Sequence, residues 1–458
     1  MKNFRILLIT LMTATLPAAS FAFDFKQGGM CYNINDDGKT VTFTYETPIL
    51  IALDAPAPSE VGYVGDIVIP ETVKHNGTTY KVTAIDRYAF SANSELTSVM
   101  IPASVKTIGE GAFMQCFRLK QVTLPPALTE IPPYAFAESG INSITIPSKV
   151  KRIAPYAFNN TSLKEVSIPN SVTSIGSAAF SACRWMEKMN MGKNVKEIGE
   201  AAFSICTSLK SIKLPASLLK IGKTAFYECS SIEEITIPAA VTEIGDGALR
   251  SCHALTSISV ENGNTKYDSR NGCNAIVETS TSTIVAACKN STIPPTVTTI
   301  GNEAFYGCRG MTSIHIPESV TKIGDQAFFY CTDLKSVEIP NSVVEIQERA
   351  FCGCDSLESV VIGNSVKSIG YGAFLHDDHI KSVTLGSAIT SIKEWAFKGL
   401  DAATSITSMI QDVTSVEMGK NVFDEINTKA CTLYVPRGTA QHYKVSPQWK
   451  QFTNIIEK

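Results

Sequence analysis

A short apolar pair, alanine followed by phenylalanine, recurs along most of this chain and constrains its fold more than any other feature. In one copy leucine replaces the phenylalanine. The second residue of the pair stands at Phe90, Phe113, Phe136, Phe158, Phe180, Phe203, Phe226, Leu249, Phe305, Phe328, Phe351, Phe374 and Phe397. The spacing is almost constant, and the one long interval, from Leu249 to Phe305, corresponds to one repeat plus an insertion. This regularity predicts one solenoid of stacked repeats, although a chain of 458 residues would otherwise suggest several domains.

One repeat shows why such units stack. Its recurring positions are Leu209, Ile212, Leu214, Pro215, Leu218, Ile221, Gly222, Ala225, Phe226 and Cys229. Ile212 and Leu214 alternate with polar residues, as in a strand with one buried face, and Pro215 ends that strand because it cannot donate a ladder hydrogen bond. We expect Gly222 to allow a tight bend and Phe226 to fill the interior. A single unit cannot bury its apolar face, whereas stacked units bury it continuously, with strands about 4.8 Å apart.

These residues carry a family resemblance. The pattern Leu209-x-x-Ile212-x-Leu214 resembles the leucine-rich repeat. The 23-residue period, the Ile-Pro after the strand and the Ile-Gly-x-x-Ala-Phe-x-x-Cys segment are similar to those of the BspA-type leucine-rich-repeat family of bacterial surface and secreted proteins, over about residues 60–458. The resemblance implies a β-rich leucine-rich-repeat solenoid, a right-handed coil of 22–23-residue repeats with a parallel sheet, capped at both ends. It also implies a binding or adhesion protein, but it does not specify a ligand.

The first 22 residues have the pattern of a secretory signal peptide. Lys2 and Arg5 form a positive start, an apolar run covers residues 6–19, and small residues place the cleavage after Ala22. The apolar run is shorter than the roughly 20 residues that cross a membrane, and no later segment is long and apolar enough to do so. The sequence therefore predicts an exported protein, secreted or associated with the cell surface, without a membrane span.

A solenoid exposes its core at both ends unless other residues cover it. Two strands around the turn Asp36–Lys39 predict an N-terminal cap, and the apolar residues after Pro436 predict a C-terminal lid. The insertion has two short apolar strands around Ser280-Thr281, which predict a hairpin that projects from the coil as a loop. The expected organisation is a signal peptide (1–22), an N-terminal cap with β-hairpins (23–81), leucine-rich repeats (82–260), an insertion with a β-hairpin (261–292), further repeats (293–430) and a C-terminal cap (431–458).

The charge pattern argues against two classes of partner. The chain has 40 lysine and arginine residues and 43 aspartate and glutamate residues, a formal net charge of −3. Removal of residues 1–22, which carry two positive side chains and no acid, takes the charge to −5. The sequence has neither a basic footprint for nucleic acid nor a polybasic stretch for anionic lipid.

Eight of the thirteen cysteines occupy one slot of the repeat, three residues after the Ala-Phe or Ala-Leu pair: Cys116, Cys183, Cys206, Cys229, Cys252, Cys308, Cys331 and Cys354. In other repeats the slot holds Asn93, Ser139, Thr161 and Asp377, small residues that satisfy backbone groups in a turn. Successive cysteines in the stack would have Cβ atoms about 4.8 Å apart, whereas a disulfide prefers about 3.8 Å. We therefore expect buried free thiols at this slot, even in an exported protein.

Two cysteines outside the slot, Cys273 and Cys288, flank the predicted hairpin of the insertion. If the hairpin is centred on Ser280-Thr281, the two lie opposite each other across antiparallel strands. The sequence therefore offers one candidate disulfide, Cys273–Cys288, with a pair of small buried residues as the alternative.

The densest cluster of metal-binding residue types is the turn His376-Asp377-Asp378-His379. Two histidines and two carboxylates can hold zinc, but a short turn rarely brings four ligands together, so the cluster is a weak candidate and a solvated turn is the alternative. No phosphate-binding loop, nucleophile elbow or zinc-protease helix motif occurs in the sequence. A regular solenoid also lacks the deep pocket of most catalytic sites. The sequence therefore predicts neither an enzyme nor a cofactor.

Two further motifs have simpler explanations. The segment 33–38 partly matches a calcium loop, but Thr44 replaces the bidentate glutamate, and a hairpin turn explains the same residues. Cys352 and Cys354 suggest redox or metal chemistry by their spacing. Because Cys354 occupies the repeat slot and should point inward, we expect the two side chains to diverge.

The residue between the two buried positions of each repeat strand should point to solvent. Along the chain these residues are Met100, Thr123, Thr145, Ser167, Asn190, Lys213, Thr236, Ser259, His315, Glu338, Val361, Thr384 and Glu417. Most are serine or threonine, which suits a solvated strand surface, and few are the tryptophan, tyrosine or arginine residues typical of protein hot spots. Lys213, His315 and Glu338 depart from this pattern and are the candidate partner-binding residues.

The leading functional hypothesis is an exported, non-catalytic binding scaffold that contacts an extracellular protein or another macromolecule through an extended repeat surface. The first alternative is a glycan-binding accessory protein, which would need an aromatic cluster on one face, with Tyr267 or Tyr306 as examples. The second alternative is a structural spacer without a ligand, which the serine and threonine surface permits. Nucleic acid is not an expected partner.

Overall fold

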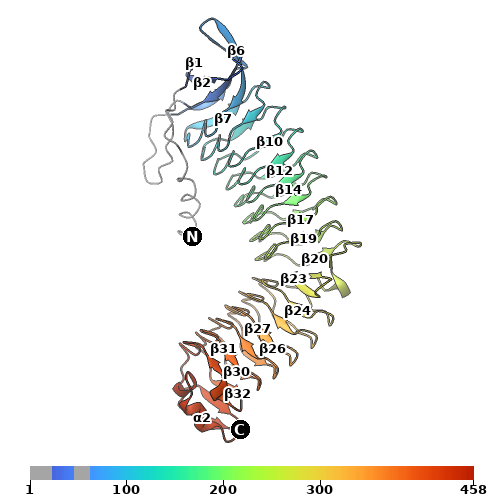
Figure 1. The fold of residues 1–458 in the computed structure, drawn as a ribbon, viewed down its shortest axis with the longest axis vertical. Helices are drawn as coiled ribbons and strands as arrows, with labels where there is room; N and C mark the ends of the chain where they lie inside the picture. The colour runs from blue at the N-terminus through green and yellow to red at the C-terminus, as the bar shows by residue number, and fades with distance from the viewer. Residues whose placement is uncertain (1–22, 46–61) are drawn as a thin grey trace. The chain divides into compact units, whose positions relative to one another are not determined.

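The computed structural model describes residues 23–45 and 62–458. The predicted signal peptide, residues 1–22, lies outside the described residues. The chain divides into two compact units, Met1–Cys183 and Arg184–Lys458. In each unit the described residues form a stack of coils (Figure 1).

The first unit consists of short strands joined by turns. Its strands are β1 (Phe25–Gln27), β2 (Met30–Ile34), β3 (Thr40–Thr44), β4 (Gly65–Val68), β5 (Thr72–His75), β6 (Thr78–Ile85), β7 (Leu96–Met100), β8 (Thr107–Ile108), β9 (Gln121–Thr123), β10 (Glu130–Ile131), β11 (Arg152–Ile153), β12 (Glu165–Ser167) and β13 (Ser174–Ile175). Within this unit the sheet orders are β1-β2-β3-β6-β5 with β8 also paired to β6, β4-β7-β9, and β10-β11-β13.

The second unit continues the same alternation and adds short helices. Its elements are β14 (Lys188–Asn190), β15 (Glu197–Ile198), β16 (Ser211–Ile212), β17 (Lys220–Ile221), β18 (Glu234–Ile237), β19 (Glu243–Ile244), β20 (Ser257–Val260), β21 (Tyr267–Asp268), η1 (Arg270–Gly272), β22 (Ala275–Glu278), β23 (Thr283–Ala287), β24 (Thr299–Ile300), β25 (Lys322–Ile323), β26 (Ser336–Ile339), β27 (Glu345–Ile346), β28 (Ser359–Ile362), β29 (Ser368–Ile369), β30 (Ser382–Leu385), β31 (Ser391–Ile392), β32 (Ser405–Ser408), η2 (Val413–Ser415), β33 (Glu417–Met418), β34 (Thr432–Val435), α2 (Ala440–Val445), η3 (Trp449–Gln451) and β35 (Asn454–Glu457). Within this unit the sheet orders are β14-β16, β15-β17-β19, β18-β20, β21-β22-β23-β24-β25-β27-β29-β31-β33, and β26-β28-β30-β32-β34-β35.

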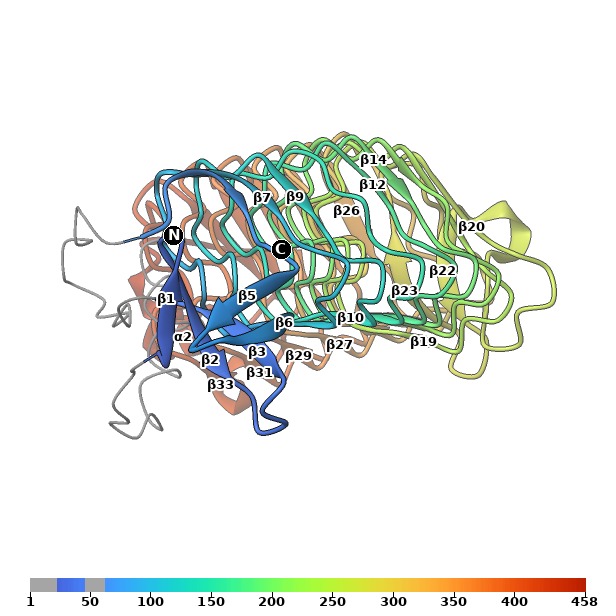
Figure 2. The same cartoon turned by 90° about the horizontal axis from the view of Figure 1, so that it is seen from above.

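Both units have the predicted repeat architecture, a solenoid with parallel sheets. Each coil contributes strands to two ladders, one on each side of the coil; in Figure 2, β9 and β12 lie on one side and β10 on the other. The register places equivalent residues side by side: Ile153 pairs with Ile175 in the first unit, and Ile300 pairs with Ile323 in the second. Because isoleucine follows isoleucine from coil to coil, the apolar side chains form continuous columns inside each unit.

The phenylalanines of the Ala-Phe pairs form one of these columns, as predicted. Ring centroids are 4.7–5.4 Å apart from Phe43 to Phe180 in the first unit. They are 4.8–5.3 Å apart from Phe305 to Phe397 in the second unit. These rings are buried, and neighbouring rings lie nearly parallel, so each coil is held to the next by aromatic stacking as well as by backbone hydrogen bonds.

Two positions in each coil adopt the left-handed backbone conformation, two residues before and two residues after the phenylalanine or leucine of the pair. Around Phe203, Ala201 has a φ of 52° and Ile205 a φ of 62°. A residue with a side chain loses about 1–2 kcal/mol in this conformation. Hydrogen bonds between coils hold it in place: Phe203 N donates to Ala225 O at 2.8 Å, and Ile205 N donates to Tyr227 O at 2.6 Å.

Gly222 has a different role from the bend predicted for it. Its φ lies outside the left-handed region. A Cβ atom at this position would lie 2.5 Å from Glu200 N and 2.5 Å from the carbonyl carbon of Gly199, both in the preceding coil. Glycine is therefore needed at this point because the two backbones approach too closely for a side chain.

The cysteine slot is filled as predicted. All thirteen cysteines lie within the described residues, and all are buried free thiols. In most of these slots the thiol donates to the carbonyl oxygen of the phenylalanine one coil earlier, at 3.0 Å from Cys229 Sγ to Phe203 O and 3.3 Å from Cys354 Sγ to Phe328 O. Cys308, which follows the insertion, donates to Ala287 O instead. Burial raises the pKa of Cys331 to about 12. The slot thiols are therefore uncharged hydrogen-bond donors rather than nucleophiles.

The N-terminal end of the first unit is closed by hairpins. Strands β2 and β3 pair in antiparallel fashion, with Ile34 opposite Val41, and the Phe43 ring stacks on Phe90 at 4.7 Å. In the turn between these strands, Asp37 Oδ1 accepts hydrogen bonds from Lys39 N and Thr40 N, both at 2.8 Å. The segment that partly matches a calcium loop is thus a hairpin turn whose aspartate already binds backbone amides.

The C-terminal end of the second unit extends one coil beyond the repeats found in the sequence. Phe423 stacks on Phe397 at 6.0 Å, although it comes later in the chain than the regular spacing predicts, and Trp449 packs against Phe423 at 4.8 Å. Tyr443 is buried beneath this coil, where its hydroxyl donates to Ile410 O at 2.8 Å. After this lid the chain returns to the sheet, and β35 pairs with β34 as a final parallel strand that the sequence did not predict.

Candidate functional site

The solvent side of the strand ladders presents one row of side chains, which we call the strand face. In the second unit its consecutive members are Glu338, Val361, Thr384, Thr407, Tyr434 and Ile456, paired from strand to strand. In the first unit Val68, Met100 and Thr123 are paired in the same way. The three predicted partner-binding residues, Lys213, His315 and Glu338, are all exposed. The strand face is thus a regular and accessible row within each unit.

The sequence interpretation wrongly assigned one residue, Glu417, to the strand face. Glu417 lies in β33, which pairs with β31 in the other ladder, and its Oε1 accepts from Lys393 Nζ at 2.9 Å. Thr407 occupies the position that the sequence interpretation gave to Glu417, because the loop after β32 lengthens this repeat. Beyond it, Tyr434 and Ile456 add an aromatic and an apolar side chain that the sequence interpretation did not include.

The four residues of the metal candidate do not come together. Asp377 is fully buried, whereas His376, Asp378 and His379 are exposed. Asp377 occupies the cysteine slot, and a slot side chain points into the coil while the residues beside it point out. In the part of the chain that the structure describes, no group of three or more histidine, cysteine, aspartate or glutamate side chains is arranged to hold a metal ion.

Asp377 is instead an acid in the slot that elsewhere holds a thiol. Its Oδ1 accepts a hydrogen bond from Cys354 N at 2.7 Å, and its Oδ2 is buried without a partner among the described residues. Burial raises the pKa of Asp377 well above its ordinary value, and the amide of Cys354 opposes this shift only in part. The neighbouring Cys352 and Cys354 are both buried free thiols, and the Cys354 thiol donates a hydrogen bond to Phe328 O at 3.3 Å.

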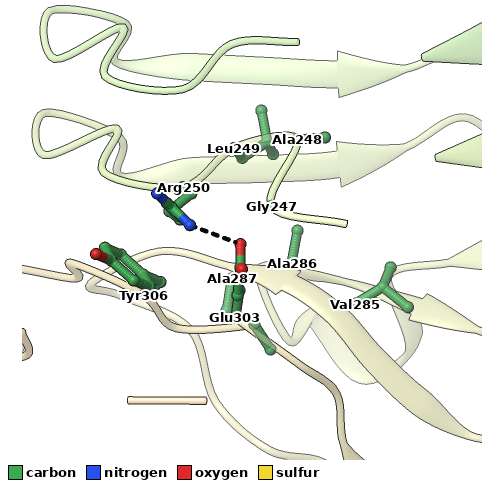
Figure 3. A pocket seen from close by; sticks show the side chains of 10 residues that line it. Gly247, Ala248, Leu249, Arg250, Val285, Ala286, Ala287, Glu303 and Tyr306 are labelled. Atoms are coloured by element: carbon green, nitrogen blue, oxygen red, sulfur yellow. Dashed lines mark ion pairs between the residues drawn. The ribbon is translucent and has the colours of Figure 1, made fainter. Parts of the chain in front are cut away.

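A cationic clamp lies where the coil of Leu249 meets the coil of Phe305 (Figure 3). The Arg250 guanidinium lies 4.6 Å from the ring centroid of Tyr227 and 4.3 Å from that of Tyr306. Its Nη1 also pairs with Glu303 Oε2 at 3.2 Å. The space beside these residues is about 10 Å³, roughly enough for one water molecule. The clamp therefore joins two coils across the insertion and leaves no room for a ligand.

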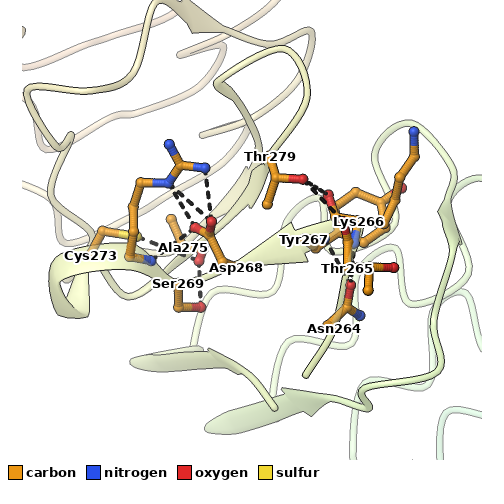
Figure 4. A network of polar contacts seen from close by, with 10 residues as sticks. Asn264, Thr265, Lys266, Tyr267, Asp268, Ser269, Cys273, Ala275 and Thr279 are labelled. Atoms are coloured by element: carbon orange, nitrogen blue, oxygen red, sulfur yellow. Dashed lines mark hydrogen bonds and ion pairs between the residues drawn. The ribbon is translucent and has the colours of Figure 1, made fainter. Parts of the chain in front are cut away.

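The insertion forms the predicted hairpin, but it does not project from the coil. Strands β22 and β23 are antiparallel, and β23 pairs in parallel with β24, the next strand of the regular ladder. Ala275, Val277 and Ile284 are buried members of the core. Figure 4 shows the polar network around Asn264, Asp268 and Ser269 in the rest of the insertion. Arg270 Nη2 pairs with Asp268 Oδ2 at 2.8 Å. The hairpin is thus part of the solenoid wall, because its apolar side chains are needed there to continue the core.

The candidate disulfide Cys273–Cys288 is not formed in the structure, where both residues are buried free thiols. A β-bulge between Ile276 and Val277 shifts the hairpin register, so that Ala275 pairs with Ala287. Following this register, Cys288 faces Asn274, and Asn274 Nδ2 lies 3.3 Å from Cys288 Sγ. The predicted strands and the register next to the turn, Val277 with Ile284 and Glu278 with Thr283, are confirmed, but beyond the bulge the register differs from the prediction by one residue.

Asn274 connects the insertion to the preceding coil. Its Oδ1 accepts from Ile258 N at 2.7 Å, and its Nδ2 donates to Thr256 O at 2.7 Å. These bonds satisfy backbone groups at the side of β20 that faces away from β18. Its φ of 56° is also left-handed, a conformation that asparagine tolerates better than most residues.

Asn274→Ala is expected to reduce the free energy of unfolding by about 1–2 kcal/mol more than Asn271→Ala, because it removes the side-chain acceptor of Ile258 N and the shorter of two hydrogen bonds to Thr256 O, which keeps only Asn290 Nδ2 at 3.4 Å. Asn271 is a matched control, since it has a similar φ of 57° but an exposed side chain. Urea denaturation followed by circular dichroism measures the difference. Equal losses for the two variants would show that the side-chain hydrogen bonds of Asn274 do not hold the insertion in place.

The two tyrosines considered for glycan stacking have structural roles. Tyr267 is buried, and its hydroxyl accepts a hydrogen bond from Ile244 N at 3.1 Å. Tyr306 is partly buried between Arg250 on one side and Phe329, at 4.8 Å, on the other. Neither ring offers a free face for a sugar.

None of the helices in the described part of the chain has the length and apolarity that a membrane-crossing helix needs. A chemical reaction would need converging groups with perturbed pKa values in a cleft. Among the described residues, Asp377 is instead fully buried in the slot, and Arg250 is partly buried in the clamp. The arrangement is suited to binding along an exposed face.

Comparison with known proteins finds similar leucine-rich-repeat chains. A family model described as the BspA type leucine rich repeat region matches residues 83–207, 180–285 and 282–404. A leucine-rich repeat protein from Bacteroides ovatus is similar over 95% of this chain and 100% of its own, with 27% identity and a TM-score of 0.65. A leucine rich cell surface protein from Faecalibacterium prausnitzii is similar over 86% of this chain and 96% of its own, with 28% identity and a TM-score of 0.63. The pneumococcal vaccine antigen PcpA, at 18% identity and a TM-score of 0.57 over 95% and 98% of the two chains, shares the fold. No curated protein matches.

Proposed function

The chain belongs to the BspA-type leucine-rich-repeat family, and from this premise we propose that it is an exported, non-catalytic scaffold that binds an extracellular macromolecule through its strand face. The observation that carries the proposal is the row of exposed and partly exposed side chains itself, paired from Glu338 to Ile456 without a break. Such a row gives a partner many equivalent contacts on a rigid backbone, as extended repeat surfaces do.

Two observations support export. Residues 1–22 have the charge and apolar pattern of a signal peptide. The similar protein from Faecalibacterium prausnitzii is described as a cell surface protein. Export also suits the uncharged buried thiols, since burial protects them from oxidation in an oxidising compartment.

The contact residues that we propose for a protein partner are Lys213, His315 and Glu338. All three are exposed, and each side chain is charged or titratable. The neighbouring positions are mostly serine and threonine, which contribute little to the free energy of binding. A second candidate function, saccharide binding, is favoured by a polar hollow beside Tyr434 in the second unit.

A binding array that carries extracellular matrix proteins and polysaccharides, probed with purified residues 23–458, tests the proposal. A protein ligand whose binding is weakened by Lys213→Ala, His315→Ala or Glu338→Ala would support adhesion through the strand face. A polysaccharide ligand would favour the second candidate. The absence of any ligand would favour a structural spacer and contradict the proposed function.

A further inference from the structure

A hollow of about 390 Å³ lies on the solvent side of the second unit, where strands β30, β32 and β34 end. Its polar and aromatic lining comes from Asn364, Ser387, Thr407, Gln411, Tyr434 and Lys458. This volume falls within the range of small-ligand sites, about 300–1,000 Å³. The hollow therefore differs in kind from the space beside Arg250, which holds about one water molecule.

The repeat changes locally beside the hollow. Proline follows β26 at Pro340, but Gly363 follows β28 and Gly386 follows β30. A Cβ atom at Gly386 would clash with the carbonyl oxygen of Gly363, so these coils pack here without side chains. After β32 the chain takes a longer path through residues 409–415, which the buried Tyr443 hydroxyl fixes by its hydrogen bond to Ile410 O. Met409 and Gln411 of this longer path line the hollow.

The polar groups around this space are held in place and have capacity for a ligand. Asn364 is anchored on both sides: its N donates to Asn341 Oδ1 at 2.7 Å, and its Oδ1 accepts from Ser387 N at 3.2 Å. This arrangement leaves Asn364 Nδ2 as a donor without a partner among the described residues. Ser387, Thr407 and Gln411 add hydroxyl and amide groups, and no aspartate or glutamate side chain is among the residues that line the hollow.

Tyr434 supplies a flat apolar surface to the hollow. Its neighbours in the strand face are Thr407 on one side and Ile456 on the other. The Lys458 ammonium lies 3.3 Å from the ring centroid, so one face of the ring is covered by a positive charge. The Tyr434 side chain is partly exposed and lines the hollow.

We propose that the hollow beside Tyr434 binds an acidic saccharide unit, that is, a sugar ring that carries a carboxylate. The C–H face of the sugar packs on the Tyr434 ring, its hydroxyls pair with Asn364, Ser387 and Gln411, and its carboxylate pairs with the Lys458 ammonium. The other lining residues, Ser408, Met409, Val435 and Pro436, add a hydroxyl group and further apolar surface beside the Tyr434 ring. The inference rests on the proposed binding function and names the ligand class for one part of the strand face.

Isothermal titration of residues 23–458 with trigalacturonic acid and with its neutral counterpart, galactotriose, tests the proposal. We expect the acidic sugar to bind more tightly than the neutral one. Tyr434→Ala should lower the affinity for the acidic sugar by about tenfold or more, because it removes the stacking surface. Lys458→Met keeps the methylene stem against the ring and removes the charge, so it should abolish the preference for the acidic sugar.

Two further variants distinguish the loss of a binding contact from a loss of folding. Gln411→Ala changes an exposed side chain and should also weaken binding, while thermal melting shows that it folds normally. Tyr330→Ala is the matched control, because Tyr330 is another exposed aromatic residue of the second unit and does not line the hollow. It should leave both affinities unchanged.

Other outcomes overturn the inference. Failure of both sugars to bind, equal affinity for the two, or insensitivity to Tyr434→Ala would each contradict it. If neither sugar binds but a protein on the array binds through Lys213, His315 or Glu338, the saccharide proposal is wrong and the proposed binding function stands. If neither the sugars nor the array give a ligand, both proposals fail.

Discussion

Replacement of Phe226 by alanine is expected to lower the free energy of unfolding by about 3–5 kcal/mol. The ring is fully buried and stacks on Phe203 at 5.6 Å, so its loss removes apolar contacts and leaves a cavity that neighbouring coils cannot fill. Urea denaturation of the wild type and the variant, followed by circular dichroism, measures the change.

Trp185→Ala is the matched control for this prediction. Trp185 is a larger aromatic residue of the same unit, but its side chain is 63% exposed. Its removal should cost no more than about 0.5 kcal/mol, as for other surface substitutions. A loss below about 1 kcal/mol for Phe226→Ala would show that the phenylalanine column is not the core.

Asp377→Asn is expected to stabilise the protein at neutral pH, by about 2 kcal/mol or more, and to flatten its dependence of stability on pH. The pKa of Asp377 is raised by burial, so the folded protein holds the proton at pH values where the unfolded chain has released it. The stability from this group is complete below the unfolded pKa, about 3.9, and falls as the pH rises through the folded pKa. The amide has no proton to lose and keeps the acceptor for Cys354 N.

Another coil shows that asparagine suits this slot. Asn93 Nδ2 donates to Phe90 O at 2.6 Å, and an asparagine at 377 can donate to Phe374 O in the same way. Melting of the wild type and Asp377→Asn between pH 4 and pH 8 tests the prediction, with Asp378→Asn as the exposed control. Parallel pH profiles for the wild type and Asp377→Asn would mean that Asp377 is not a buried, proton-holding acid.

The fold was predictable because the sequence pattern that specifies it repeats along the chain. Each buried position recurs at almost the same spacing from coil to coil, so the strands, the phenylalanine column and the cysteine slot were all visible in the sequence. The left-handed positions beside the phenylalanine gave no such signal. They hold residues as different as Ala201, Thr224 and Trp395, because closure of the coil, not the side chain, sets their conformation.

The predictions failed where the period breaks. Phe423 was missed, and Glu417 misplaced, because the loop after β32 lengthens one repeat. The hairpin register beyond the bulge could not be predicted, because a run of small apolar residues gives no sequence signal for the position of a bulge. The burial of the insertion was foreseeable, because Ala275, Val277 and Ile284 carry the apolar alternation of a wall strand.

The binding surface was predictable only in its placement. Exposure of Lys213, His315 and Glu338 follows from strand alternation, and the structure agrees. The hollow beside Tyr434 is lined by Asn364, Gln411 and Lys458, among others, which are far apart in the sequence and meet only in the folded chain.

The most direct test of the central claim compares two arginine substitutions in one coil. Thr236 and Thr242 are both exposed threonines that hydrogen-bond to a neighbouring coil, but Thr236 lies on the strand face in β18, while Thr242 precedes β19 in the other ladder. Biolayer interferometry with the strongest ligand from the array is expected to show affinity lowered at least about tenfold by Thr236→Arg, through steric and charge conflict on the strand face, and unchanged by Thr242→Arg. Unchanged affinity for Thr236→Arg, or an equal loss for both variants, would contradict binding through the strand face.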